Sequence, residues 1–150
     1  MEYNLPSELV KNLDFGLEAK EKVITGINKL VRAVKSTLGA SGRCVVYEDG
    51  RGKPVITKDG VTVAESVVLY DPVENMGATL IKEAARNTVK EAGDGTTTAT
   101  VLAEALIKQI DTAIADGLTI REIKDGVNET LDSVINYLND KAIDLSLIHI

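Results

Sequence analysis

Residues Gly93–Thr100 read GDGTTTAT and stand between two stretches with helical periodicity. Asp94 is a hard oxygen ligand of the kind that Mg²⁺ takes alongside phosphate oxygens. Gly93 and Gly95 let the backbone bend tightly and come close to a ligand. The hydroxyl row that follows consists of Thr96, Thr97 and Thr98. At a helix start, such hydroxyl and N–H groups lie where the helix dipole favours an anion, so the run could hold a metal-bound polyphosphate.

A simpler explanation of the same run stays open. Gly-Asp-Gly also ends ordinary helices, and Thr is an ordinary N-cap residue. Taken alone, the run favours this explanation. However, three consecutive threonines are poor helix formers, and one cap would have sufficed, so the excess calls for another reason.

Composition indicates one globular domain with an aliphatic core. The chain has 150 residues, of which 44% are hydrophobic and 27% charged, and this is enough for one sizeable core. The net charge of −6 argues against a dedicated nucleic-acid binder, although it leaves a local nucleotide site open. The single cysteine, Cys44, excludes an internal disulfide and is expected to be a small buried hydrophobe. The N-terminal stretch MEYNLPSELV lacks the pattern of a signal peptide or a membrane span.

Hydrophobic periodicity predicts a mainly helical fold with one small hairpin. A helix is expected over about Phe15–Leu38, with two apolar rows that would bury it well, and with Gly26 placed for close packing. Cys44–Tyr47 and Val55–Thr57 read as two short strands joined by a turn-rich link. Val61–Leu69 is apolar and fits either a strand or a short helix. The two rows of the first helix are Ala19, Val23, Ile27, Leu30, Val34 and Leu17, Ile24, Val31, Leu38.

Three more helices are predicted after the hairpin. The first starts at Asp71-Pro72 and ends at Gly93, and the second runs from the Thr run to Asp116-Gly117. Thr119 and Glu122 form a capping box for the last. Strands and helices do not alternate, so a doubly wound nucleotide fold is not expected. The expected apolar side of the first of these helices is Val73, Met76, Leu80, Ile81, Ala84 and Thr88.

Two other polar loops are candidate ligand sites. No Walker A sequence and no G-x-G-x-x-G fingerprint occurs, so a nucleotide site must be of another kind. Thr37–Arg43, TLGASGR, combines two glycines with a cation, although it also fits a simple helix end. Ile56–Ala64, ITKDGVTVA, places Lys58 where it could contact a phosphate and Asp59 where it could orient water or a metal. It equally fits an Asp-Gly turn beside a solvated lysine.

In this order, the loops resemble those of the group I chaperonins, the GroEL-like ATP-driven folding machines. The family pattern reads TLGPKGR, ITKDGV, ENMGA and GDGTTTATVLA. Here the segments are TLGASGR, ITKDGVTVA, ENMGA at Glu74–Ala78 and GDGTTTATVLA at Gly93–Ala103. The resemblance runs from about Phe15 to Lys141 and implies the N-terminal half of the family's equatorial ATP-binding domain.

The resemblance also implies roles for individual residues. The segment Thr37, Leu38, Gly39 and Ala40 would contact the nucleotide, and Lys58 would lie near the phosphates. Asp94 would bind Mg²⁺. The phosphates would be wrapped by Gly95, Thr96, Thr97 and Thr98. Asp59 matches a supporting catalytic residue near the attacking water.

Two departures from the family pattern concern the first loop. Ala40 stands where the family has Pro, and Ser41 where it has Lys. Ala restores φ freedom and loosens the loop. We expect a modest change in nucleotide affinity, because backbone atoms make most of that contact.

The resemblance predicts a layout of three parts. Residues 1–14 would form a flexible arm, 15–140 the equatorial half, and 141–150 either the start of an intermediate domain or an artefactual tail. Family members are several times longer, and the implied main catalytic aspartate has no counterpart here. Leu145–Ile150 reads LSLIHI, which is what the transposon-end adapter string CTGTCTCTTATACACATC encodes. His149 would then be an artefact. We therefore expect poor ATP hydrolysis by this chain alone.

Taken together, the expected function is that of an ATP-dependent chaperonin ATPase that assists protein folding. The implied cofactors are ATP and Mg²⁺, with K⁺ as a further candidate. The implied partners are other subunits in homo-oligomeric rings, a co-chaperonin and unfolded polypeptides, with no nucleic acid or membrane, in the cytoplasm. An alternative is a non-catalytic structural or regulatory ring subunit. A third, a small kinase-like phosphotransferase, would need a catalytic base beyond Asp59 and Asp94.

Overall fold

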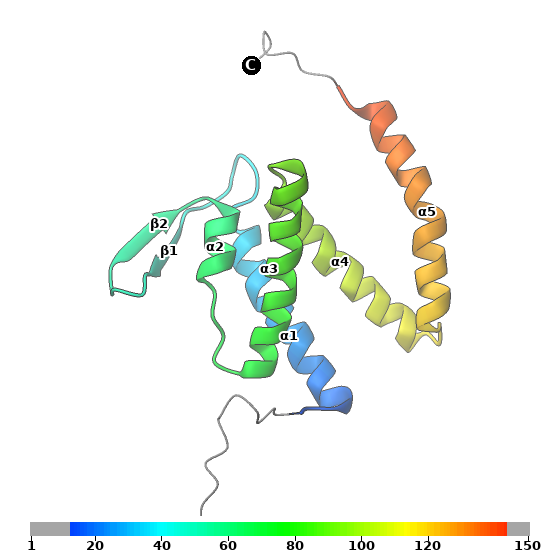
Figure 1. Cartoon of the computed structure of the whole chain (residues 1–150), viewed down its shortest axis with the longest axis horizontal. Helices are drawn as coiled ribbons and strands as arrows, with labels where there is room; N and C mark the ends of the chain where they lie inside the picture. Colours follow the sequence, from blue (N-terminus) through cyan, green and yellow to red (C-terminus); the bar gives the residue numbers. More distant parts are fainter. Residues whose placement is uncertain (1–12, 144–150) are drawn as a thin grey trace, which may run out of the picture. The chain divides into compact units, whose positions relative to one another are not determined.

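The computed structural model describes residues 13–143, and its helices follow the predicted order (Figure 1). Residues 1–12 of the predicted arm (1–14) and residues 144–150 of the predicted last segment (141–150) lie outside this range. The chain divides into two compact units, one up to Ala105 and one from Leu106. The elements are α1 (Gly16–Lys35), β1 (Val45–Glu48), β2 (Pro54–Thr57), α2 (Gly60–Ser66), α3 (Pro72–Ala92), α4 (Thr96–Ala115) and α5 (Ile120–Lys141). The prediction of a mainly helical fold with one hairpin is confirmed.

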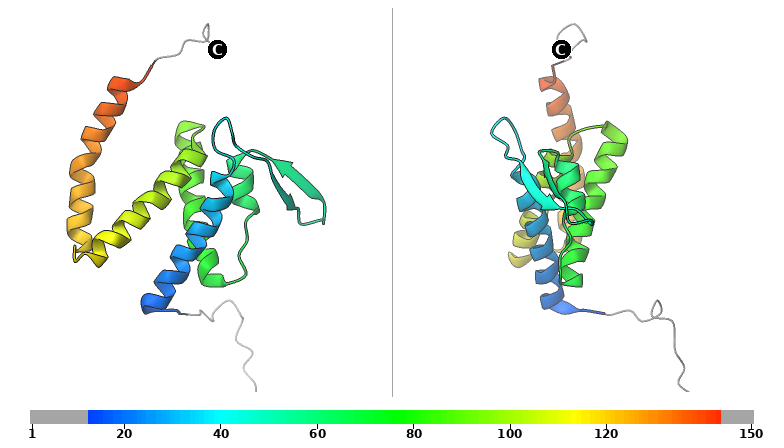
Figure 2. Two further views of the ribbon diagram at one scale, coloured as in Figure 1. Left: turned by 180° about the vertical axis from the view of Figure 1, so that it is seen from behind. Right: turned by 90° about the vertical axis from the view of Figure 1, so that its left-hand side faces the viewer.

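The core of the first unit lies between α1, α2 and α3. In both figures α1 and α3 cross each other, and the short α2 lies beside them (Figures 1 and 2). Burial of these aliphatic side chains supplies the main stabilisation of the unit. The buried residues are Ile27, Leu30, Val31 and Val34 of α1, Val63 and Ala64 of α2, and Ala78, Ile81 and Ala85 of α3.

The two long helices meet almost backbone to backbone. A β-carbon added at Gly26 would overlap the carbonyl oxygen of Glu74, and one added at Gly77 would overlap that of Val23. The prediction that Gly26 serves close packing is therefore confirmed. The same contact changes which side of α3 is buried, because only small residues fit between backbones this close. Met76 and Leu80, predicted to face the core, are 65% and 62% exposed, so that part of the prediction was wrong.

The predicted wide apolar stripe of α1 is buried only in the second half of the helix. Leu30 and Val31 are fully buried, whereas Leu17 is 70% exposed and Leu38 is 44% exposed. The helix begins after Phe15 and ends at Lys35, so Leu38 lies in the loop that follows. Burial of α1 therefore follows the extent of its contact with α3 rather than the length of the apolar pattern.

The hairpin pairs β1 and β2 in antiparallel register, with Val45 opposite Thr57 and Glu48 opposite Pro54. Its turn is closed by the Asp49 carboxylate, which accepts hydrogen bonds from the N–H groups of Arg51 and Lys53 at 2.8 and 2.9 Å. The prediction of a hairpin is confirmed. Cys44, however, lies just before β1 and is exposed, so the prediction of a buried thiol was wrong.

Both ends of α3 follow the sequence signals. The Asp71 carboxylate accepts hydrogen bonds from the N–H groups of Val73 and Glu74, and Pro72 occupies the first turn. These bonds lower the pKa of Asp71, the bond from Glu74 most of all. Gly93 ends the helix in the left-handed conformation, at φ 79°. The ambiguous segment from Val61 is resolved as the seven-residue helix α2.

The second unit contains the end of α4 and all of α5. The predicted capping box is present: the Glu122 carboxylate accepts from the Thr119 N–H at 2.8 Å, and the Thr119 hydroxyl accepts from the Glu122 N–H. An apolar pocket of about 320 Å³ is lined mainly by Ile110, Ile120 and Ile123. No residue of α5 is buried. Among the described residues, no helix is long and apolar enough to cross a membrane.

Candidate functional site

The connection between α3 and α4 is a tight loop built on two glycines. Gly93 and Gly95 have φ angles of 79° and 87°, a region that other residues rarely adopt. The Gly93 N–H donates to the Val89 carbonyl at 2.8 Å and thereby ends α3. Between the glycines, the exposed Asp94 carboxylate accepts from the Gly95 N–H at 2.6 Å. The proposed ordinary role of Gly-Asp-Gly as a helix stop is thus real, and it leaves the carboxylate facing solvent.

The three threonines after Gly95 differ in burial. Thr96 is only 6% exposed, and its carbonyl accepts the Thr100 hydroxyl at 2.8 Å. Thr97 is half-buried, and Thr98 is exposed. Because Thr96 is already the first residue of α4, none of the three is its N-cap. The residue before the helix is Gly95, which has no side chain to cap the first amides, so the ordinary N-cap explanation is wrong.

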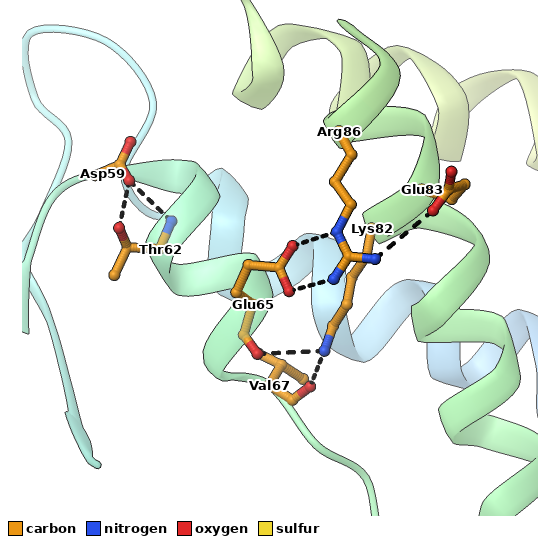
Figure 3. Close-up of polar contacts among 7 residues, drawn as sticks. All are labelled: Asp59, Thr62, Glu65, Val67, Lys82, Glu83 and Arg86. Carbon is orange, nitrogen blue, oxygen red and sulfur yellow. Dashed lines mark hydrogen bonds and ion pairs between the residues drawn. The ribbon is translucent and has the colours of Figure 1, made fainter. Parts of the chain in front are cut away.

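The second predicted loop begins α2 rather than forming a hairpin-like turn. The Asp59 carboxylate accepts the Thr62 N–H at 2.8 Å and also the Thr62 hydroxyl (Figure 3). These bonds, led by that from the hydroxyl, lower the pKa of Asp59 and favour its ionised form. Lys58 is exposed directly before it. The segment therefore presents one cation and one carboxylate to solvent.

A single close contact joins the second and third loops. A β-carbon at Gly60 would overlap the hydroxyl oxygen of Thr97 and would lie 3.5 Å from the Val34 side chain. A side chain at this position would therefore displace the Thr97 hydroxyl, because the start of α2 lies directly against the start of α4. The contact brings Asp59 and the threonine run to one place, with the end of α1 beside them.

The first predicted loop closes on itself next to this contact. The Thr37 hydroxyl donates to the Val34 carbonyl at 2.7 Å, and the Arg43 N–H donates to the Ser36 carbonyl at 2.8 Å. Gly39 has φ 74°. Leu38, Gly39 and Ala40 are exposed at the tip. In both views this loop lies at the same end of the first unit as the α3–α4 loop (Figures 1 and 2).

The side chains at this end of the unit suit a metal ion that is bound together with a nucleotide, rather than one held by protein side chains alone. Among the described residues, no group of three or more His, Cys, Asp or Glu side chains could hold a metal ion. Mg²⁺ in nucleotide sites ordinarily takes one or two carboxylates and completes its shell with phosphate and water oxygens. Exposed Asp94 could provide such a carboxylate, and exposed Lys58 could provide positive charge.

One polar cluster, which joins the end of α2 to α3, has no signal in the sequence. The Arg86 guanidinium donates from Nε and Nη2 to the two oxygens of Glu65, both at 2.7 Å (Figure 3). This pairing lowers the pKa of Glu65 and raises that of Arg86. Lys82 donates to the Val67 carbonyl at 2.6 Å. Glu65 lies on α2 and Val67 directly after it, 21 and 15 residues from their partners on α3, so no helical or strand periodicity links them.

The comparison with known families agrees with this arrangement. The model of the TCP-1/cpn60 chaperonin family matches residues 30–148, which is most of the chain and includes all three loops. The chain belongs to the TCP-1/cpn60 chaperonin family. Membership gives this chaperonin chain a role in protein folding, within a family whose members are generally ATPases. The family also suggests oligomeric assembly with other subunits.

Proposed function

We propose that this chaperonin chain supplies nucleotide-binding loops of an ATP-dependent, group I-like equatorial domain. The observation that carries the proposal is the seating of Gly60 against Thr97. It brings two loops that are far apart in the sequence to one end of the unit. Both loops carry the residue types that a Mg²⁺–nucleotide needs.

The metal and phosphate roles fall to the α3–α4 loop. Asp94 would hold Mg²⁺, which neutralises phosphate charge when it is bound. The first amides of α4, with the hydroxyls of Thr97 and Thr98, would face phosphate oxygens at the positive end of the helix dipole. Gly95 would allow the phosphates to approach the backbone, because a side chain at φ 87° would be strained there.

The residues at the start of α2 would add a positive charge, from Lys58, and a carboxylate that accepts hydrogen bonds, from Asp59. Lys58 would contact a phosphate as a point charge. Asp59 would accept a hydrogen bond from water, because its carboxylate, whose pKa Thr62 lowers below the ordinary value, is ionised at neutral pH. The exposed backbone of Thr37–Ala40 would contact the remainder of the nucleotide.

The wider assembly forms part of the same proposal. Rings of like subunits, a co-chaperonin and unfolded polypeptides would be the partners, in the cytoplasm. Nucleotide would then act by binding one state of the ring more tightly than another, since a ligand shifts a conformational equilibrium only through such a difference. K⁺ stays a candidate additional cation.

Calorimetric titration of the chain with ATP, with and without Mg²⁺, tests the proposal. We expect Mg²⁺-dependent binding that Asp94→Asn weakens roughly tenfold or more, since hydrogen bonds and ligation to charged groups contribute at this level. Asp132→Asn removes the same charge from exposed α5 and is the matched control, with affinity expected to stay unchanged. Absence of binding by the parent chain, or equal losses in both variants, would contradict the proposed site.

A further inference from the structure

Helix α2 is too short to hold its own orientation. It has seven residues, which is two turns, and helices of this length depend on tertiary contacts for their stability. Its first end carries Asp59 and Gly60, which belong to the candidate site. Burial of Val63 and Ala64 holds its middle, and the contacts at its other end help to decide where Asp59 and Gly60 lie.

Helix α3 fastens that other end with two cationic side chains one turn apart. Arg86 forms the two-bond contact with Glu65 on the last turn of α2 (Figure 3). Lys82 donates to the carbonyls of Val67 and Glu65, at 2.6 and 3.4 Å. Cations are favoured at this end of a helix, and the planar fork of Arg fixes direction as well as distance.

The same helix also leads into the second half of the site. Two turns beyond Arg86, α3 ends at Gly93, and Asp94 follows directly. Helix α3 is thus connected to Asp94 by the covalent chain. It is connected to α2, whose N-cap is Asp59, by the Glu65–Arg86 pair. The place at which α2 is fastened along α3 sets the spacing between the two carboxylates.

We propose that Glu65 and Arg86 are positioning residues for the nucleotide site, which hold the start of α2 against the start of α4. This inference rests on the proposed function. A purely stabilising role explains less of the geometry, because the pair is half-exposed, and exposed ion pairs contribute little to stability. The two hydrogen bonds between Arg86 and Glu65 instead specify where the end of α2 lies along α3.

Nucleotide titration of the full chain tests the pair. In Glu65→Gln and Arg86→Gln, affinity for Mg²⁺–ATP is expected to fall roughly two- to fivefold, the range that an exposed ion pair supports. The exchanged pair Glu65→Arg with Arg86→Glu is expected to recover most of that loss. Glu129→Gln is the matched control, because it makes the same substitution at an exposed carboxylate of α5. Unchanged affinity in both single variants, or an equal loss in the control, would overturn the inference.

Amide exchange without nucleotide separates this inference from the proposed function. Glu65→Gln should speed exchange at Thr62 and Val63 and in the first turn of α4, while the middle of α1 keeps its rate. The exchanged pair should restore the rates. If the parent chain binds no nucleotide, the proposed function fails, and these rates still decide the positioning claim: unchanged rates in Glu65→Gln overturn it.

Discussion

The crossing of α1 and α3 and the helix α5 have similar amphipathic patterns in the sequence, but their apolar side chains differ in burial. Both regions repeat apolar residues at steps of three and four. In the crossing, Leu30, Val31 and Ile81 are buried. In α5, Leu131 is 49% exposed, and no residue of the helix is buried.

The difference shows that periodicity selects a face and a partner determines burial. The crossing has its partner within the same unit, and glycines allow two backbones to meet. Helix α5 has its start specified by a capping box and leaves its apolar face accessible within the described residues. Contiguous apolar surface of this kind is typical of interaction sites.

Glycine substitutions test the comparison most strongly. Gly77→Ala places a β-carbon against the Val23 carbonyl, so the backbones must separate. We expect a loss of about 3 kcal/mol or more in the free energy of unfolding, measured by urea denaturation. Gly126→Ala in α5 meets no atom within 4 Å and should stabilise the chain by about 0.5–1 kcal/mol. Changes of the same sign in both variants would break the comparison.

Truncation of one leucine in each region gives the next largest difference. Leu30 is fully buried, and Leu30→Ala should cost about 2–5 kcal/mol because it leaves a cavity. Leu131→Ala should change the unfolding free energy by only about 0.5 kcal/mol. Thermal and urea unfolding at several protein concentrations would reveal the opposite case. A large, concentration-dependent cost at Leu131 would mean that α5 is covered by association.

Acid titration compares the N-terminal caps of α3 and α5, and its expected effect on stability is the smallest of the three. The pKa values of Asp71 and Glu122 are lowered from 3.8 and 4.5, each chiefly by a backbone N–H bond. Each carboxylate therefore contributes stability at neutral pH that is lost as pH falls from the ordinary pKa through the folded value. Asp71→Asn and Glu122→Gln should each flatten the fall in stability between roughly pH 5 and 3. An unchanged slope in either variant would show that the cap is not formed in solution.

The parts of the fold that local signals determine could be predicted from the sequence. Pro72 and Asp71 mark the start of α3, and Thr119 with Glu122 marks that of α5, because capping uses residues within one turn. The exposure of Met76 could not be predicted, since it follows from the distance between two helices. The Glu65–Arg86 pair could not be predicted for the same reason.

The candidate site divides in the same way. The residue types of Lys58, Asp59 and Asp94 are readable from their loops, and their roles follow from the family resemblance. The seating of Gly60 on Thr97 depends on tertiary packing, and only the structure reveals it.

Amide exchange of the full chain with and without Mg²⁺–ATP tests the central claim, that three loops at one end of the first unit form one nucleotide site. We predict simultaneous protection of residues 37–43, 58–62 and 93–99, with α5 unchanged, and loss of all three effects in Asp94→Asn. Protection confined to one loop, or none at saturating nucleotide, would contradict the account.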